Sequence, residues 1–359
     1  MRILQLIQKP QNRGAEMFTC QLSNHLINLG HEVKIVALYA GLATLPFNGK
    51  IEVLNNTHSN RFLDFKHWKK LANIISNFQP DLVQANAGDT LKYAVFSKKL
   101  FSWKEPIIFR NASEVGRYLK SPVQKSLNRF LYKNVEWVIS VSKASKNDIV
   151  KHFPFLKDKV EVVGVGLEEM KNPESRILDP RGHKHIVHVG GFSFEKNHKV
   201  LIQIFQLILK KQPHTHLHLV GDGPLKPVIE ELVRSNSLQD HVSFYGFVSD
   251  PLTYISAADV LVLPSIIEGL PGVILEAMIC KVPVVAYNVG GISEILSDET
   301  GFLIPQNDCD AFANKTLEAL DLDSNKMIEQ AYNLVSSNFM NSNLALNFVN
   351  SYQKLVPIL

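Results

Sequence analysis

Two hydrophobic patterns alternate along most of this chain. Short apolar runs rich in β-branched residues are typical of buried strands, and longer segments with apolar residues three or four apart are typical of amphipathic helices. The short runs predict strands at Ile3–Ile7, Glu32–Leu38, Leu82–Ala85, Ile107–Phe109, Trp137–Val141, Val160–Val163, Ile186–Val189, Leu217–Val220, Val242–Tyr245, Val260–Leu263 and Val282–Ala286. The longer segments predict helices at Glu16–Leu29, Trp68–Phe78, Val123–Lys133, Lys199–Lys211, Pro224–Ser235, Val273–Cys280 and Asn341–Leu355.

Strands that alternate with helices indicate parallel sheets covered by helices on both faces, and the pattern occurs twice. We therefore predict an α/β protein with two Rossmann-like, doubly wound parallel-sheet domains. The first covers residues 1–168 and the second residues 184–337, with a linker at 169–183 that contains prolines and lacks apolar periodicity. Because such sheets bind ligands at the carboxyl ends of their strands, we expect a ligand cleft between the two domains.

Composition narrows the class of protein. The chain has 359 residues, of which 45% are hydrophobic, enough for two buried cores, so a wholly disordered chain is excluded. No run of about 18 apolar residues occurs, so no membrane-spanning helix is predicted. The three cysteines, Cys20, Cys280 and Cys309, are far apart in the sequence and form no CxxC pair, which argues against a disulfide framework or a zinc ribbon. We therefore expect a cytoplasmic location.

Charge is distributed unevenly between the two halves. Residues 1–170 contain 24 Lys and Arg against 14 Asp and Glu, whereas residues 171–359 contain 14 Lys and Arg against 20 Asp and Glu. A basic first half attracts anionic lipid, nucleic acid or phosphorylated substrates, and composition alone does not choose among these partners.

The segment 265–280, SIIEGLPGVILEAMIC, carries the strongest chemical signal. It follows a predicted strand and opens a helix, with Pro271 suited to the first helical position. The N–H groups near Gly269, Leu270 and Gly272 would then lie at the positive end of the helix, where they can hold a phosphate. Glu268 and Glu276 on either side could each accept hydrogen bonds from a sugar. Two glutamates in solvent at a helix start are the alternative interpretation.

A second strand-to-helix turn lies in residues 189–202, VGGFSFEKNHKVLI. Gly190 and Gly191 allow close approach to the backbone, and Lys196 could neutralise a leaving diphosphate, although it could equally be a surface lysine. Further glycine turns follow other strands, at Gly221 in LVGDGP and at Gly14 in NRGAEM. No GxGxxG follows the first strand, which argues against a nicotinamide cofactor.

Taken together, these motifs resemble a known family. FEKNH, LVGDGP, YGFVSDPLTYISAADVLVLPSIIEGLP, VGGISEI and TGFLIP, together with EGLPGVILEAM, are similar in order and spacing to the signature of retaining glycosyltransferases of family 4, which have the GT-B fold. The match is dense over residues 186–305. RGAE, LINLGHEV, PDLVQA and VISVSKASKNDI extend it more weakly into the first half.

The resemblance implies a nucleotide-sugar donor, UDP-linked or GDP-linked, with no further cofactor and no metal. It implies that residues 338–359 pack back onto the first domain. By position, Glu276 would hold the ribose and Glu268 the transferred sugar, while Lys196 would contact the diphosphate. The backbone near Phe247 and Val248 would contact the base. Gly14, Gly190, Gly191, Gly221, Gly269, Leu270 and Gly272 would complete the donor site, and Lys196 and Glu268 would be the catalytic pair.

The chain departs from the family pattern at several positions. Most members have arginine where this chain has Gly191, so Lys196 would act alone on the diphosphate or with another cation such as Arg13. Asn86 stands where many members have histidine, and Arg110 and Asn111 stand where another histidine is common. We assign Arg13, Asn86, Arg110 and Asn111 to the acceptor side.

Two segments of the first half, 61–71 and 117–133, mix basic residues with aromatic ones. This mixture suits an anionic membrane surface, and a solvated basic face over an apolar core stripe is the alternative. No nucleic-acid-binding motif occurs, so nucleic acid is not an expected partner. Six histidines at 183, 185, 188, 214, 216 and 218 also invite a metal site, but strand positions without acidic or cysteine partners favour packed histidines.

The sequence thus predicts a retaining glycosyltransferase that moves a sugar from a nucleotide sugar to a glycan or lipid-linked acceptor, in cell-surface polysaccharide or glycolipid synthesis. Two alternatives remain. One is a catalytically impaired partner that binds the donor for another transferase, and the other is a sugar-nucleotide epimerase of the same fold.

Overall fold

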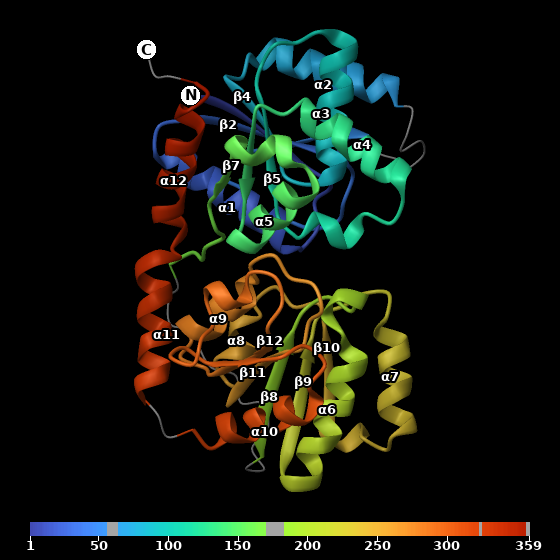
Figure 1. Ribbon diagram of the computed structural model, residues 1–359, viewed down its shortest axis with the longest axis vertical. Coiled ribbons are helices and arrows are strands. Elements are labelled where there is room, and N and C mark those ends of the chain that lie inside the picture. Colours follow the sequence, from blue (N-terminus) through green and yellow to red (C-terminus); the bar gives the residue numbers. More distant parts are fainter. Residues whose placement is uncertain (56–63, 170–182, 323–324, 357–359) are drawn as a thin grey trace. The chain divides into compact units, whose positions relative to one another are not determined.

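The computed structural model describes residues 1–55, 64–169, 183–322 and 325–356 (Figure 1). The chain divides into two compact units. Unit 1 comprises Met1–Glu168 with Asn341–Leu359, and unit 2 comprises Glu169–Met340. The predicted linker, 169–183, lies almost entirely outside the described residues.

Unit 1 is built on a seven-stranded sheet whose pairings are all parallel, in the order β3-β2-β1-β4-β5-β6-β7. Its strands are β1 (Arg2–Ile7), β2 (Glu32–Tyr39), β3 (Ile51–Asn55), β4 (Leu82–Ala85), β5 (Ile107–Asn111), β6 (Trp137–Ser140) and β7 (Val160–Val162). Its helices are α1 (Gly14–Asn28), α2 (Phe65–Phe78), α3 (Gly88–Phe101), η1 (Val115–Tyr118), α4 (Pro122–Lys133), α5 (Lys143–His152), η2 (Pro154–Lys159) and α12 (Asn341–Gln353).

Alternation along the strands sends neighbouring side chains to separate cores in unit 1. Ile3 of β1 packs with α1 and with Leu344, Phe348 and Tyr352 of α12. Its neighbour Leu4 packs in the core that contains the buried faces of α2, α3 and α5. The last helix of the chain therefore covers the same face of this sheet as the first one, as Figure 1 shows.

Unit 2 repeats the plan with a six-stranded parallel sheet in the order β10-β9-β8-β11-β12-β13. Its strands are β8 (Lys184–Val189), β9 (Thr215–Val220), β10 (Val242–Gly246), β11 (Val260–Leu263), β12 (Val284–Tyr287) and β13 (Phe302–Ile304). Its helices are η3 (Phe194–Lys196), α6 (His198–Lys211), α7 (Lys226–Ser235), η4 (Gln239–His241), α8 (Leu252–Ile255), α9 (Gly272–Ile279), η5 (Ile292–Glu294), α10 (Cys309–Leu320) and α11 (Asn325–Asn338). The two-sheet α/β prediction is confirmed.

The differences from the predicted elements are local. The strands β3 and β13 were not predicted, because each is short and lies at a sheet edge, where one side lacks a partner strand. Pro271 is the residue before α9 rather than its first residue, since its backbone is still extended (φ −76°, ψ 114°) and the helix begins at Gly272. Among the described residues, no helix combines the length and apolar character that crossing a bilayer requires.

Candidate functional site

In unit 2, the strand order reverses between β8 and β11, and two loops follow these strands at the same edge of the sheet. This edge is where doubly wound sheets bind ligands. The first loop runs from Gly190 to Asn197 and the second from Pro264 to Pro271. Lys196 Nζ of the first loop lies 2.7 Å from Glu268 Oε1 of the second. The side chains of this pair are 22% and 10% exposed.

Hydrogen bonds to the backbone hold these two loops together. The backbone N–H of Ile266 donates to the carbonyl of Glu195 at 2.8 Å, and Asn197 Nδ2 donates to the carbonyl of Pro264 at 3.1 Å. Asn197 has a left-handed backbone (φ 57°), which asparagine tolerates better than most residues. Lys196 is therefore placed by a fixed turn.

Glycine is required at two places where backbones meet beside this pair. A Cβ on Gly290 would lie 1.9 Å from the carbonyl oxygen of Glu268, and one on Gly221 would lie 2.1 Å from that of Gly190. Both glycines also have positive φ. Gly191 differs, because a Cβ there would meet only the carbonyl oxygen of Asp222, at 3.5 Å. Gly191 therefore leaves room for a side chain.

The start of α9 offers free hydrogen-bond donors. Within the described chain, the N–H groups of Gly269, Leu270 and Gly272 donate no hydrogen bond, and no side chain caps the helix. The carbonyl of Gly269 accepts from the N–H of Gly291 at 2.8 Å, which fixes the turn. A row of free donors at a helix N-terminus, beside a lysine, suits a phosphate group.

Glu276 lies in the second turn of α9 and is partly buried. Its burial raises the pKa of the carboxyl to about 7; the nearby Lys196 opposes this rise and Asp250 adds to it. No hydrogen bond to this carboxylate comes from any residue that the structure describes. The group is thus a strong acceptor without a protein donor.

Two buried, uncharged histidines, His188 and His198, lie close to Lys196. His188 Nδ1 donates to the carbonyl of Val262 at 2.9 Å, and the ring of His198 lies edge-on to it, 4.7 Å between centroids, and stacks on Phe192 at 4.0 Å. Burial lowers the pKa of His188 to about 4 and that of His198 to about 2, with the positive charge of Lys196 contributing in both cases. Neither histidine was predicted as a site residue from the sequence, although both adjoin the motifs of the site.

Two further residues assigned to the donor site from the sequence, Phe247 and Val248, also lie in unit 2. Phe247 follows β10, neighbouring β9 in the sheet, and its side chain is 53% exposed, whereas Val248 is partly buried. Both residues therefore lie just beyond the carboxyl end of β10.

In unit 1, the proposed residues divide into two groups. Arg13 and Gly14 are exposed at the start of α1, and a Cβ on Gly14 would meet nothing within 4 Å. Asn86, Arg110 and Asn111 are only 1–3% exposed. Asn86 Nδ2 donates to Gln5 Oε1 at 2.9 Å, and Asn111 Nδ2 donates to Ser140 Oγ at 3.2 Å. The two asparagines are thus hydrogen-bonded to other residues of unit 1.

Arg110 is buried without an acidic hydrogen-bond partner. Its guanidinium lies 4.2 Å from the ring centroid of Phe18, and its Nε and Nη1 have no hydrogen-bond partner among the described residues. Burial lowers its pKa to about 10, an effect that Tyr352 and Glu16 partly offset. Sequence reasoning placed Arg110 on the acceptor side, and the structure packs it against an aromatic ring.

The strand histidines are joined to neighbouring polar side chains. His185 Nδ1 lies 3.0 Å from His218 Nε2, and His218 Nδ1 lies 2.8 Å from the hydroxyl of Tyr245. His216 Nε2 lies 2.9 Å from Ser243 Oγ. Within the described ranges, no group of three His, Cys, Asp or Glu side chains is arranged to hold a metal ion.

Comparison with known proteins gives the family. The family model described as Glycosyl transferases group 1 matches residues 183–321, and the one described as Glycosyltransferase Family 4 matches residues 12–169. The chain belongs to glycosyltransferase family 4. This family 4 glycosyltransferase is 27% identical to the O-antigen chain mannosyltransferase B of Escherichia coli over 67% of its own length and 65% of the relative's.

Other relatives extend the comparison. An uncharacterized glycosyltransferase of Methanocaldococcus jannaschii is 26% identical over 70% of this chain and 67% of its own. Among solved structures, Anabaena HepE in complex with UDP and glucose superposes with a TM-score of 0.81 at 18% identity, covering 99% of this chain and 100% of that one. A sucrose-phosphate synthase from Thermosynechococcus elongatus superposes with a TM-score of 0.84 at 20% identity, covering 99% of both chains. These likenesses show the GT-B fold.

Proposed function

We propose that this glycosyltransferase transfers a sugar from a UDP-linked or GDP-linked donor, with retention of anomeric configuration, to a glycan or lipid-linked acceptor in cell-surface polysaccharide or glycolipid synthesis. The single observation that carries the proposal is the cluster in unit 2: Lys196 paired with Glu268 beside the uncapped start of α9 and the unpartnered carboxylate of Glu276. The cation and the free N–H donors suit a diphosphate, and the two carboxylates suit the sugars on either side of it.

Each group has a distinct part in this proposal. The N–H donors of Gly269, Leu270 and Gly272 and the ammonium of Lys196 bind the diphosphate. The carboxylate of Glu276 accepts hydrogen bonds from the ribose diol, and Glu268 does the same for the transferred sugar. The base lies along the backbone at Phe247 and Val248. The complex of Anabaena HepE with UDP and glucose, a protein of the same fold, supports a donor of this class.

The proposed reaction needs no protein nucleophile. The acceptor oxygen forms its bond to the anomeric carbon on the face from which the phosphate leaves, as the bond from that carbon to the phosphate oxygen breaks. The acceptor's proton passes to the departing phosphate oxygen. Lys196 and the α9 donors stabilise the charge that develops on the diphosphate, which is the largest demand of this step, and no metal is required on this account.

Unit 1 supplies the acceptor side, with Arg13, exposed at the start of α1, as an accessible cation, whereas its neighbour Gly14 belongs to the proposed donor site. The basic character of unit 1, 25 Lys and Arg against 13 Asp and Glu, favours an acceptor held at an anionic membrane surface in the cytoplasm. The name of the E. coli relative, an O-antigen chain mannosyltransferase, supports a glycan product of this kind.

The test uses the purified chain, radiolabelled UDP- and GDP-sugars and a bacterial lipid extract as acceptor. We expect label from one nucleotide class to enter the lipid phase, with no loss on adding EDTA, and nuclear magnetic resonance of the product to show the donor's anomeric configuration. Donor binding without transfer to any acceptor would favour a catalytically impaired partner. Conversion of the donor sugar without an acceptor would favour an epimerase.

A further inference from the structure

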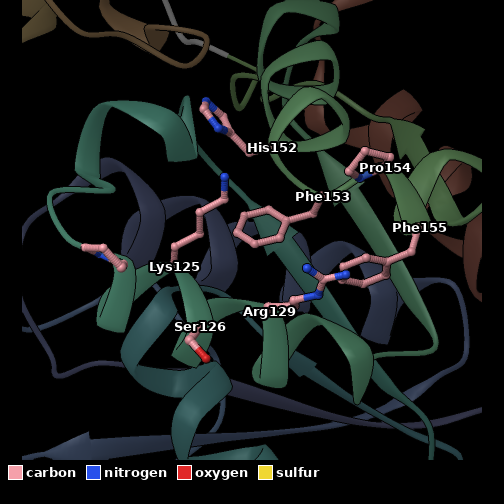
Figure 2. Close-up of a pocket in the computed structure, with 8 residues that line it drawn as sticks. Lys125, Ser126, Arg129, His152, Phe153, Pro154 and Phe155 are labelled. Carbon is pink, nitrogen blue, oxygen red and sulfur yellow. The ribbon is translucent and has the colours of Figure 1, made fainter.

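A cavity of about 280 Å³ lies within unit 1, between the first half of α4 and the turn that joins α5 to η2. Pro122, Lys125, Ser126 and Arg129 line it from α4, and His152, Phe153, Pro154 and Phe155 line it from the other side. Figure 2 shows the ring of Phe153 between Lys125 and Arg129, and the guanidinium of Arg129 beside the ring of Phe155, 6.0 Å from its centroid.

The cationic groups of this cavity have no acidic partner of their own. Lys125 and Arg129 are four residues apart on α4 and so share one helix face. Neither forms an ion pair or a hydrogen bond through its side chain with any described residue. One acid, Asp148, contacts the lining residue His152, whose Nε2 lies 3.6 Å away, and also accepts a hydrogen bond from the N–H of Gly116 at 2.8 Å. Residues 115–135 contain no Asp or Glu at all.

Large apolar side chains are exposed on α4 and at the cavity wall. Val123 in the first turn of α4 is 79% exposed, Phe130 is 41% exposed and Phe155 at the cavity rim is 38% exposed. Phe130 also ends a row of ring contacts that runs through Phe96 and Trp68 to Phe65, which is 54% exposed. A free anion would pair with the cations and leave these apolar side chains in water. An anionic lipid bilayer would pair with the cations and also bury the apolar side chains.

We propose that this cavity binds the phosphate of an anionic phospholipid headgroup, and that Val123, Phe130 and Phe155 enter the bilayer beside it. The positive charges of Lys125 and Arg129 complement the negative charge of a headgroup phosphate, and His152 lines the opposite wall of the cavity. This complementarity is the reason for proposing an anionic phospholipid. The inference rests on the proposed function, since it names the membrane contact that brings unit 1 to a lipid-linked acceptor. The proposal adds a specific lipid-binding site to the general attraction between the basic unit 1 and an anionic membrane.

The test is co-sedimentation of the full chain with vesicles of phosphatidylglycerol and phosphatidylcholine at low salt. We expect binding to the anionic vesicles that falls as salt is added, and little binding to phosphatidylcholine alone. The variant Lys125→Glu/Arg129→Glu should weaken binding at least about twentyfold, taking the usual contribution of each basic residue near a membrane. The matched control is Lys50→Glu/Lys104→Glu, which makes the same charge change at exposed unit 1 lysines outside the cavity and should weaken binding less than about threefold.

A second variant tests the apolar part. Val123→Ser removes an exposed apolar side chain and should weaken vesicle binding without changing its dependence on salt, because no charge is altered. All variants are first checked for an unchanged melting temperature and an unchanged thermal shift with the nucleotide sugar. That check separates the two claims, since a chain that binds its donor but not the vesicles overturns the lipid site and leaves the proposed function standing.

Three results would overturn the proposal. One is equal weakening by the cavity pair and the control pair, which would mean that unit 1 binds membranes only through its overall charge. Another is a thermal shift with inorganic phosphate or glycerol 3-phosphate, lost in the cavity variant, without vesicle binding, which would assign the cavity to a free phosphate. The third is binding to phosphatidylcholine as strong as to phosphatidylglycerol.

Discussion

The ammonium of Lys196 and the carboxylate of Glu268 are 2.7 Å apart, although they come from loops that follow different strands, β8 and β11. Each neutralises the other while the site holds no donor. A diphosphate would draw Lys196 away from Glu268 and free that carboxylate for the sugar. In the proposed donor site, the pair would therefore link binding of the phosphates to recognition of the sugar.

Replacing the cation of this pair tests its part in the reaction. Lys196→Ala should lower turnover about a hundredfold or more, because losing one contact to a developing charge costs roughly 2.7–4 kcal/mol of barrier. Steady-state kinetics with a saturating donor measure it. The control is Lys199→Ala, an exposed lysine on α6 whose side chain forms no ion pair or hydrogen bond with any described residue and which should keep normal turnover. Near-normal turnover in Lys196→Ala, with an unchanged melting curve, would contradict the assignment.

The raised pKa of Glu276 predicts a dependence of stability on pH. Because the folded chain holds this proton up to about pH 7, whereas an exposed carboxyl releases it near 4.5, the folded state binds more protons within that window. The free energy of unfolding should therefore fall as pH rises from 4.5 to 7, by up to about 3 kcal/mol from this group. Glu276→Gln removes the group, so its melting temperature should exceed that of the parent at pH 8 and converge with it near pH 4.5.

The same pKa governs donor affinity. Only the ionised carboxylate can accept two hydrogen bonds from the ribose diol, so donor binding should strengthen as pH rises through about 7. Isothermal titration between pH 5.5 and 8.5 measures this trend, and Glu276→Gln should bind weakly with no such trend. An unchanged pH trend in the variant would assign the titration to another group.

Two adjacent glycines predict opposite effects on the site. Gly191 has room for a side chain, so Gly191→Arg should add a second cation beside the diphosphate and tighten donor binding about tenfold. At Gly190, a Cβ would lie 3.2 Å from Cδ and Cε of Lys196, so Gly190→Ala should displace that side chain and weaken binding. Fluorescence titration with the nucleotide diphosphate measures the affinity of each variant and of the parent chain. Weaker binding in a folded Gly191→Arg would show that the diphosphate lies elsewhere.

The sequence predicted some parts of this account better than others. Most strands of both sheets, but not the edge strands β3 and β13, and the loops with Lys196 and Glu268 follow from local patterns, because buried β-branched runs and glycine turns are set by neighbouring residues. The burial of Arg110 against Phe18 could not be predicted, since it depends on how α1 crosses β5. The packing of His188 against His198 could not be predicted for the same reason. It brings a strand and a helix together, and the hydrophobic pattern along the chain does not show which residues of separate elements meet.

A hydrogen-bond network in unit 1 provides a prediction on stability alone. The buried hydroxyl of Tyr352 on α12 donates to Gln84 Oε1 at 2.7 Å and lies 3.4 Å from Gln5 Nε2. Tyr352→Phe leaves Gln84 without its buried donor and should lower the free energy of unfolding by about 1–3 kcal/mol. Urea denaturation measures it against Tyr332→Phe, a partly buried tyrosine of α11. A loss under about 0.5 kcal/mol would mean that water replaces the hydroxyl.

The central claim is that unit 2 binds a nucleotide sugar through Glu276 and its neighbours. The most direct test is a thermal-shift panel of UDP-, GDP-, ADP- and CMP-sugars on the parent chain and on Glu276→Ala. A ligand at 100 times its dissociation constant stabilises by about 2.7 kcal/mol, which raises the melting temperature measurably. We predict a shift with UDP- or GDP-sugars that is lost in the variant. No shift with any of the four classes, or a shift that the variant keeps in full, would contradict it.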